Sequence, residues 1–123
     1  MKNNHIYNRL VKNKLLSVES GWGKFVIELH SNLKEDNENV DGVTDFDKKT
    51  IKLEMQLSDM TARETIIHEI MHIILESVGL DEKYHNDNLS VTNEYLANTI
   101  SKQLLIISNM NPKLFETLYA TTT

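Results

Sequence analysis

Apolar residues recur at helical spacing over residues 61–79 and occupy most of the circumference of the helix that they predict. These apolar positions are Ile66, Ile67, Ile70, Met71, Ile73, Ile74, Leu75 and Val78. A helix that is apolar almost all round is buried, so we expect this segment to be the central helix of the domain. Thr61 and Glu64 form a capping-box pattern, with Ser58 as a competing N-cap. Gly79 is well placed to end the helix in a left-handed conformation.

The pattern of the remaining chain predicts a small α+β domain around this helix. The expected elements are a first helix over about 6–20, a strand over 24–31, a polar loop over 32–41, a hairpin over 42–57, a long helix over about 89–108 and a short helix that starts at Asn111-Pro112. In the second arm of the hairpin, Ile51, Leu53 and Met55 alternate with polar residues, which is typical of a half-buried strand. We expect this arm to be an exposed edge, where an extended peptide can add as another strand. Trp22, between Gly21 and Gly23, is expected to be a packing anchor.

Composition narrows the possible functions. A length of 123 residues is enough for one domain with a modest core, so we expect residues 1–123 to form a single domain. The net charge of −5 argues against nucleic acid as a partner. The absence of cysteine rules out disulfides and thiolate zinc sites, and it fits a reducing compartment. No signal peptide or membrane-spanning segment is recognisable, so the sequence predicts a cytoplasmic protein with no membrane partner.

The central helix carries a metal-binding pattern, HExxH, as His68-Glu69-Ile70-Met71-His72. Residues four apart lie on one helix face, so His68 and His72 can direct ring nitrogens at one point about 2.1 Å away, the distance that zinc needs. Glu69 would then lie beside the metal as general base for an activated water. The alternative is a chance pattern of ordinary core or surface residues. Because these three polar side chains would need partners once buried, we favour a zinc site.

Two residues are candidates for the third zinc ligand. Glu94 lies on the following helix, on a face otherwise made of small and apolar residues, and a helix holds a ligand more rigidly than a loop does. His85 lies in the connection between the two helices and is the alternative. A metzincin arrangement is excluded, because it needs Gly and His where this chain has Leu75 and Val78.

These motifs carry a family resemblance over about residues 42–115. The order of hairpin, HExxH helix and a second helix with Glu94-Tyr-Leu-Ala97-Asn98 resembles the minimal gluzincins, in particular small metallopeptidases of bacteriophages and prophages, and more distantly the ImmA/IrrE-like zinc peptidases. The resemblance implies a zincin-like minimal α+β domain with an N-terminal helix, a small antiparallel sheet or hairpin, the HExxH helix and a glutamate-bearing helix. It also implies zinc bound by His68, His72 and Glu94, with Glu69 as general base. A phage-encoded protein of this kind would act in the cytoplasm of the host bacterium.

Together these features predict a zinc metallopeptidase that hydrolyses a protein or peptide substrate. Tyr84, His85 and Tyr95 are candidates for a second donor to the developing oxyanion. The alternative function is a catalytically silent zinc-binding protein that binds a host or phage protein. The small size and the lack of room for an added helix-turn-helix domain favour this alternative somewhat. Four protein ligands on the metal would indicate the silent protein, whereas an open position would indicate the enzyme.

Overall fold

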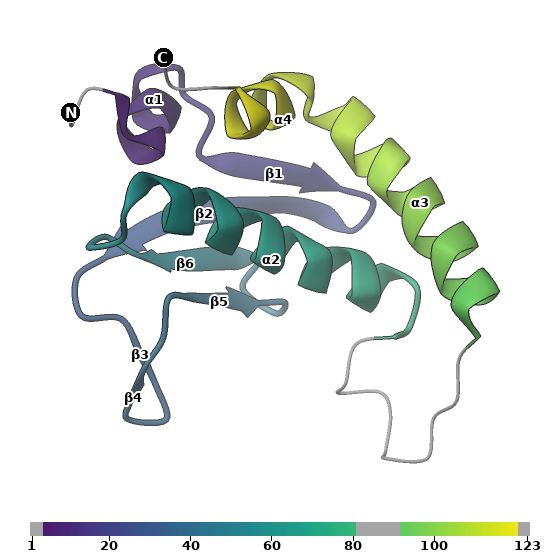
Figure 1. Cartoon of the computed structure of the whole chain (residues 1–123). Coiled ribbons are helices and arrows are strands. Elements are labelled where there is room, and N and C mark those ends of the chain that lie inside the picture. The colour runs from purple at the N-terminus through teal and green to yellow at the C-terminus, as the bar shows by residue number, and fades with distance from the viewer. Residues whose placement is uncertain (1–3, 81–91, 121–123) are drawn as a thin grey trace.

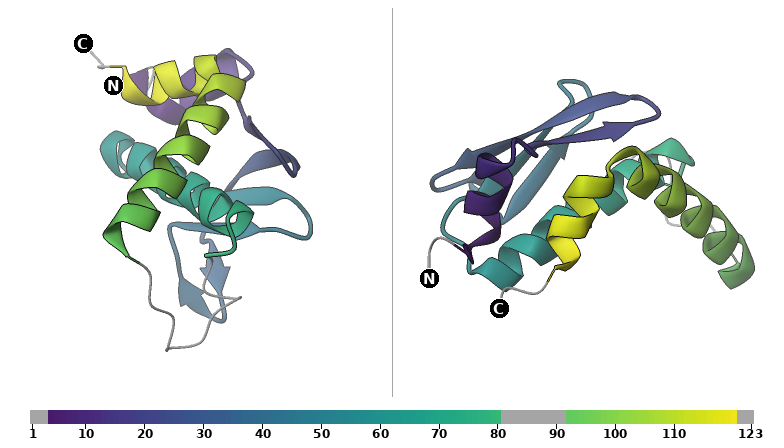
Figure 2. Two further views of the ribbon diagram at one scale, coloured as in Figure 1. Left: turned by 90° about the vertical axis from the view of Figure 1, so that its right-hand side faces the viewer. Right: turned by 90° about the horizontal axis from the view of Figure 1, so that it is seen from above.

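A four-stranded sheet and the helices on one of its faces form the two layers of the molecule (Figures 1 and 2). The computed structural model describes residues 4–80 and 92–120. In chain order the elements are α1 (Ile6–Lys12), β1 (Ser17–Ser20), β2 (Gly23–His30), β3 (Lys34–Glu35), β4 (Glu38–Asn39), β5 (Gly42–Asp45), β6 (Thr50–Glu54), α2 (Asp59–Ser77), α3 (Asn93–Met110) and α4 (Pro112–Tyr119). The predicted α+β class is confirmed.

The sheet has the strand order β1-β2-β6-β5, which places β5 at one edge and β6 inside. The pairs β1–β2 and β5–β6 are antiparallel, whereas β2 and β6 are parallel. The expected hairpin is therefore present as β5 and β6, but its second arm is not the edge strand that we predicted. β2 pairs with the side of β6 that we expected to be free, because the chain passes through β3–β4 to β5 at the outer edge and then returns as β6 between β5 and β2. The exposed edge belongs to the first arm, β5.

The core lies between the sheet and α2, which crosses one sheet face (Figure 1). On β1, β2 and β6 the buried residues on that face alternate with half-buried or exposed residues on the other face, as the period of two requires. Ile51 and Leu53 of β6 are fully buried, whereas Val26 on the other face of β2 is 44% exposed. The buried residues of α2 that complete this core include Ile66, Ile70, Ile73 and Ile74. Burial of the apolar helix in the core is as its pattern predicts.

Both ends of α2 have side-chain or backbone caps. Ser58 is the N-cap, and its hydroxyl accepts a hydrogen bond from the Thr61 N–H at 3.3 Å, so the competing cap is the one used. Gly79 follows the helix with φ of +74°, and its N–H donates to the Glu76 carbonyl at 3.1 Å. This is the left-handed termination predicted from the sequence. The helix that carries the HExxH pattern is thus defined by local signals at both ends.

The first predicted helix is too long. α1 ends at Lys12, and residues 17–20 form β1, which pairs with β2. Lys14 has φ of +57°, which takes the chain out of the helix, and Val18 is fully buried in the sheet. Long-range pairing with β2 therefore overrides a helical spacing that the residues also allow. Trp22, expected to be a packing anchor, lies in the β1–β2 turn and is 62% exposed.

The segment expected to be a polar loop contains a two-stranded hairpin, β3–β4, which protrudes from the body of the domain (Figure 1). Asp36 and Asn37 both have positive φ at its turn, a conformation that Asp and Asn tolerate better than most residues. Leu33 anchors the hairpin, because its side chain is buried and its N–H donates to Glu54 Oε1 at 2.8 Å. This N–H, followed by that of Gln56, lowers the pKa of the Glu54 carboxyl.

α3 begins at the N-cap Thr92, later than expected, and joins α4 through Asn111. Among its residues Ile107 alone is buried, so its second half holds it against the rest of the domain. Pro112 is at the start of α4, as predicted. Over residues 4–80 and 92–120, no helix is long and apolar enough to cross a membrane.

Candidate active site

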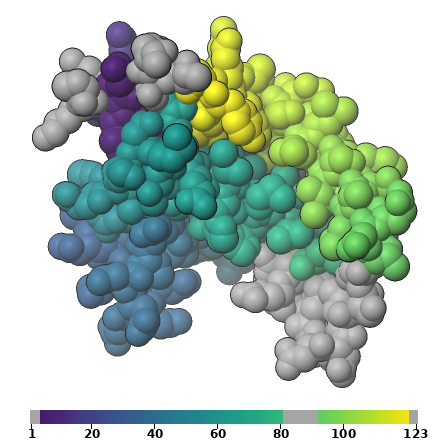
Figure 3. Space-filling model, viewed as in Figure 1, coloured from purple at the N-terminus to yellow at the C-terminus, as the bar shows by residue number. Residues whose placement is uncertain are grey.

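His68 and His72 lie next to each other on one side of α2. Their ring centroids are 4.9 Å apart, with the ring planes at 75°. His68 is exposed and His72 is half-buried. In the space-filling view, α2 contributes a strip of open surface between the β3–β4 hairpin and α3 (Figure 3). The two imidazoles are therefore adjacent, as their spacing predicts, and at least one of them is open to solvent.

Glu69 points from α2 to the edge strand of the sheet. The residue is only 5% exposed, and Thr44 Oγ1 of β5 donates a hydrogen bond of 2.6 Å to its Oε1. A carboxylate buried to this extent needs such a donor, because a lost hydration shell costs several kcal/mol unless it is replaced. The expected general base is thus held between the HExxH helix and β5.

Gly42 allows β5 to approach α2 closely at this point. A Cβ atom at position 42 would lie 2.8 Å from Thr65 Cγ2 and 3.1 Å from Glu69 Oε2. Gly42 and Thr44 are two residues apart, so they share the face of β5 that meets the helix. The register agrees, since their partners on β6 are the buried Leu53 and Ile51.

The sequence pointed to neither Thr44 nor Gly42. A Gly-x-Thr in the first arm of the hairpin that precedes the HExxH helix is the signal that could have identified them. Its meaning depends on β5 packing against the third turn of α2, which is a tertiary contact.

The third zinc ligand stays a prediction. Glu94 is in the first turn of α3 and is exposed, and the small-residue face around it, expected to be buried, is exposed as well. The buried residue of α3 is Ile107, more than three turns further on, so no fully buried residue of the helix lies near Glu94. In the described part of the chain no group of three His, Cys, Asp or Glu side chains could hold a metal ion. Tyr95 is 49% exposed, and Tyr84 and His85 lie outside the described residues.

The chemistry of the side chains on α2 nevertheless suits zinc. Two imidazoles four residues apart, with a glutamate after the first, are the donor types and spacing of a metallopeptidase helix. The adjacent rings of His68 and His72 suit two ligands of one metal ion. Glu69 is bonded to Thr44 instead, which suits a general base that does not bind the metal. The two candidates for a third ligand, Glu94 and His85, both lie outside α2.

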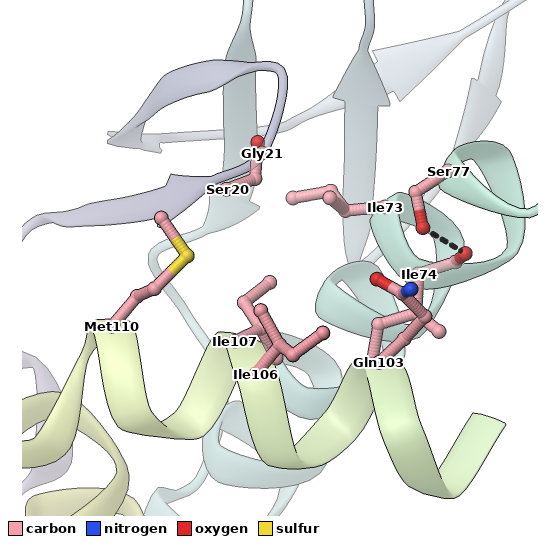
Figure 4. Close-up of a pocket in the computed structure, with 9 residues that line it drawn as sticks. All are labelled: Ser20, Gly21, Ile73, Ile74, Ser77, Gln103, Ile106, Ile107 and Met110. Atoms are coloured by element: carbon pink, nitrogen blue, oxygen red, sulfur yellow. Dashed lines mark hydrogen bonds between the residues drawn. The ribbon is translucent and has the colours of Figure 1, made fainter. Parts of the chain in front are cut away.

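A cavity elsewhere in the domain has no part in this site. It lies between the end of β1, the second half of α2 and α3 (Figure 4). Ile73, Ile74, Ile106 and Ile107 are among the side chains around it. Its volume of about 20 Å³ is enough for about one water molecule, so it is a packing gap and not a substrate pocket. The candidate site is instead an open surface beside a sheet edge.

Comparison with known proteins agrees with the helix and strand arrangement. No curated protein and no solved structure matches the chain. A family model does match, over residues 27–120, and it is that of the peptidase M78 family, described as the IrrE N-terminal-like domain. The matched region contains β5, α2 and α3. It also contains every site residue predicted from the sequence, because all of them lie between residues 68 and 95. The chain therefore belongs to the peptidase M78 family of IrrE N-terminal-like domains.

Proposed function

We propose that this protein is a zinc-dependent metallopeptidase that hydrolyses peptide bonds in a protein or peptide substrate, with Glu69 as the general base. The observation that carries the proposal is the arrangement on α2, where the rings of His68 and His72 are adjacent and Glu69, on the same helix, is bonded to the edge strand. Membership of a peptidase family supports the same reaction class.

His68 and His72 would hold the zinc, with Glu94 as third ligand and His85 as the alternative. When bound, the metal would supply Lewis-acid activation of a water molecule and of the scissile carbonyl. The protein's own part is to supply the ligands, the base and the substrate-binding surface.

Glu69 would accept a proton from the attacking water and pass it to the leaving nitrogen. Its Oε1 is bonded to Thr44, so Oε2 is the oxygen that would carry the proton. Burial of the side chain keeps bulk water away and fixes its rotamer, which favours a base of defined position.

The two edges of the sheet differ in a way that supports a peptide substrate. On β1, the Asn111 side chain bonds the backbone of Glu19 in both directions, through Oδ1 to the N–H at 2.7 Å and through Nδ2 to the carbonyl at 2.8 Å. In the part of the chain that the structure describes, no strand pairs with the outer side of β5. An extended peptide could therefore add to β5, next to Glu69.

The first experiment compares Glu69→Gln with Glu64→Gln. Glu64 is an exposed acid one turn earlier on the same helix, so its variant is a matched control. The proteins are purified without a histidine tag or chelator, and zinc content and hydrolysis of an unfolded protein are measured. We expect the wild type and both variants to bind zinc, and Glu69→Gln to lose about 100-fold or more in rate relative to the other two. Zinc-replete wild type that cuts no faster than Glu69→Gln would refute the proposal.

A second experiment identifies the third ligand. Glu94→Gln and His85→Ala are compared for zinc content, with Glu116→Gln, an exposed acid on α4, as control. We expect Glu94→Gln to bind zinc 10-fold or more weakly and the other two to bind as wild type does. Loss of zinc in His85→Ala alone would assign the ligand to the connection between the helices.

A further inference from the structure

We propose that Thr44 is a positioning residue for the general base: its hydroxyl holds one oxygen of Glu69, so that the edge strand that would bind the substrate also sets the position of the base. This inference rests on the proposed function. It gives β5 a second role, the positioning of Glu69, in addition to its role as the edge on which a peptide would dock.

The contact between Thr44 and Glu69 is one short hydrogen bond. Thr44 Oγ1 donates to Glu69 Oε1 at 2.6 Å, the distance typical of a hydroxyl bonded to a charged carboxylate. Glu69 is buried, so water does not replace this donor if it is removed. One hydroxyl therefore determines which carboxylate oxygen is occupied and which is left for proton transfer.

Two features make Thr44 a rigid donor. It is β-branched and lies in a strand, where its χ1 is restricted. Its strand can lie close to α2 because Gly42 has no side chain, and a Cβ there would be 3.1 Å from both Cγ and Oε2 of Glu69. The free oxygen Oε2 thus lies against the backbone of the edge strand.

This placement links base and substrate geometrically. A peptide added to β5 would take its register from the same strand that bonds Glu69. Displacing the carboxylate by about 1 Å from its productive position can cost on the order of 100-fold in rate. Loss of the Thr44 hydroxyl should therefore reduce the rate of the chemical step and leave docking on the strand intact.

The test uses three full-length variants. Thr44→Val removes the hydroxyl and keeps the shape, while Thr44→Ser keeps the hydroxyl. Thr50→Val on β6 is the matched control, because the buried Thr50 Oγ1 has no hydrogen-bond partner among the described residues. Zinc content, kcat and KM are measured for each with a peptide substrate.

We expect Thr44→Val to lose roughly 10- to 100-fold in kcat, with KM and zinc content within about twofold of wild type. Thr44→Ser should keep most of kcat, and Thr50→Val should match wild type. Full kcat in Thr44→Val, or an equal loss in Thr44→Ser, would overturn the positioning role while the metallopeptidase proposal stands.

A stability cycle on zinc-free protein provides a readout that needs no activity. In wild type, Thr44→Val should lower the unfolding midpoint by about 5 °C, whereas in a Glu69→Ala background the same change should have almost no effect. Equal effects in both backgrounds would show that the two side chains are not coupled and would also overturn the inference. Coupled side chains in a zinc-loaded protein that cuts nothing would refute the proposed function, and the catalytic role of Thr44 with it.

Discussion

At the scale of single residues, Gly42 determines how closely β5 approaches α2. Position 42 has no room for a side chain, since a Cβ would be 2.8 Å from Thr65 Cγ2. At Gly21, in the β1–β2 turn, a Cβ would meet no atom within 4 Å, and no positive φ forbids a side chain there. The two positions therefore form a natural comparison.

We expect Gly42→Ala to destabilise the protein by about 1–3 kcal/mol, because β5 or α2 must shift to admit the methyl group. Gly21→Ala should change stability by less than about 0.5 kcal/mol. Urea unfolding of both variants checks this. If Gly42→Ala proves as stable as Gly21→Ala, the close approach of strand and helix is not a constraint.

Tyr7 gives a pH dependence that can be assigned to one group. Burial, followed by the negative charges of Glu54 and Asp41, raises the pKa of Tyr7 from 10.0 to about 12, and its hydroxyl donates to the Glu54 carbonyl at 2.8 Å. The folded state therefore keeps the proton at a pH where the unfolded chain releases it. The resulting stability is fully present below about pH 10 and is lost as the pH rises through about 12.

We expect this group to account for a loss of about 2 kcal/mol of unfolding free energy between pH 10 and 12. Tyr7→Phe should be less stable at neutral pH by about 1 kcal/mol, through the lost hydrogen bond, and should decline less steeply at high pH. Denaturant unfolding across this pH range makes the comparison. Parallel pH profiles for both proteins would contradict the assignment.

At the scale of elements, Asn111 fastens the α3–α4 junction to the edge of the sheet. It is the N-cap of α4, at the point where the sequence predicts this helix to start, but its side chain makes no capping bond. It bonds both backbone groups of Glu19 instead, and Nδ2 also donates to the Ile107 carbonyl at 2.8 Å. The side chain thus closes an edge strand as a neighbouring strand would.

Replacing Asn111 by Ala should cost about 2 kcal/mol or more, because the backbone N–H and C=O of Glu19 on β1 lose their partner. Asn109→Ala, at an exposed position two residues earlier on α3, should be nearly neutral. Thermal unfolding measures both, and hydrogen exchange at Glu19 should increase only in Asn111→Ala. Unchanged exchange there would show that the sheet edge does not depend on this contact.

At the scale of the whole molecule, zinc binding is expected to stabilise the folded chain, because the two imidazoles are brought together only when α2 is formed. Free zinc at about 100 times its Kd adds about 2.7 kcal/mol, or roughly 10 °C in Tm for a chain of this length. Chelation should reverse the shift, and His72→Ala should abolish it. His30→Ala is the control, since His30 bonds Glu28 at the end of β2 and is not in the site.

Thermal unfolding with zinc and with a chelator tests this expectation. A zinc-dependent shift in His72→Ala equal to that of wild type would mean that the metal binds elsewhere. No shift in the wild type would remove the metal from the proposed function.

The local features of the chain could be predicted from the sequence alone. The limits of α2, its left-handed end at Gly79 and the adjacency of His68 and His72 depend on contacts within one or two helical turns. The hairpin of β5 and β6 and the start of α4 at Pro112 are equally local. In each case the residues that define the feature are close together in the chain, so the pattern contains the information.

Only the tertiary structure decided the rest, because each remaining feature depends on which distant segments meet. Residues 17–20 could extend a helix, and pairing with β2 makes them a strand. The partner of the buried Glu69 is Thr44, 25 residues earlier, which no spacing rule connects to it. The edge strand is β5 and not β6 because β2 pairs with β6 in parallel, a contact across the crossover. Helical and strand periodicity set what each segment can be, while burial of one shared core selects among those possibilities.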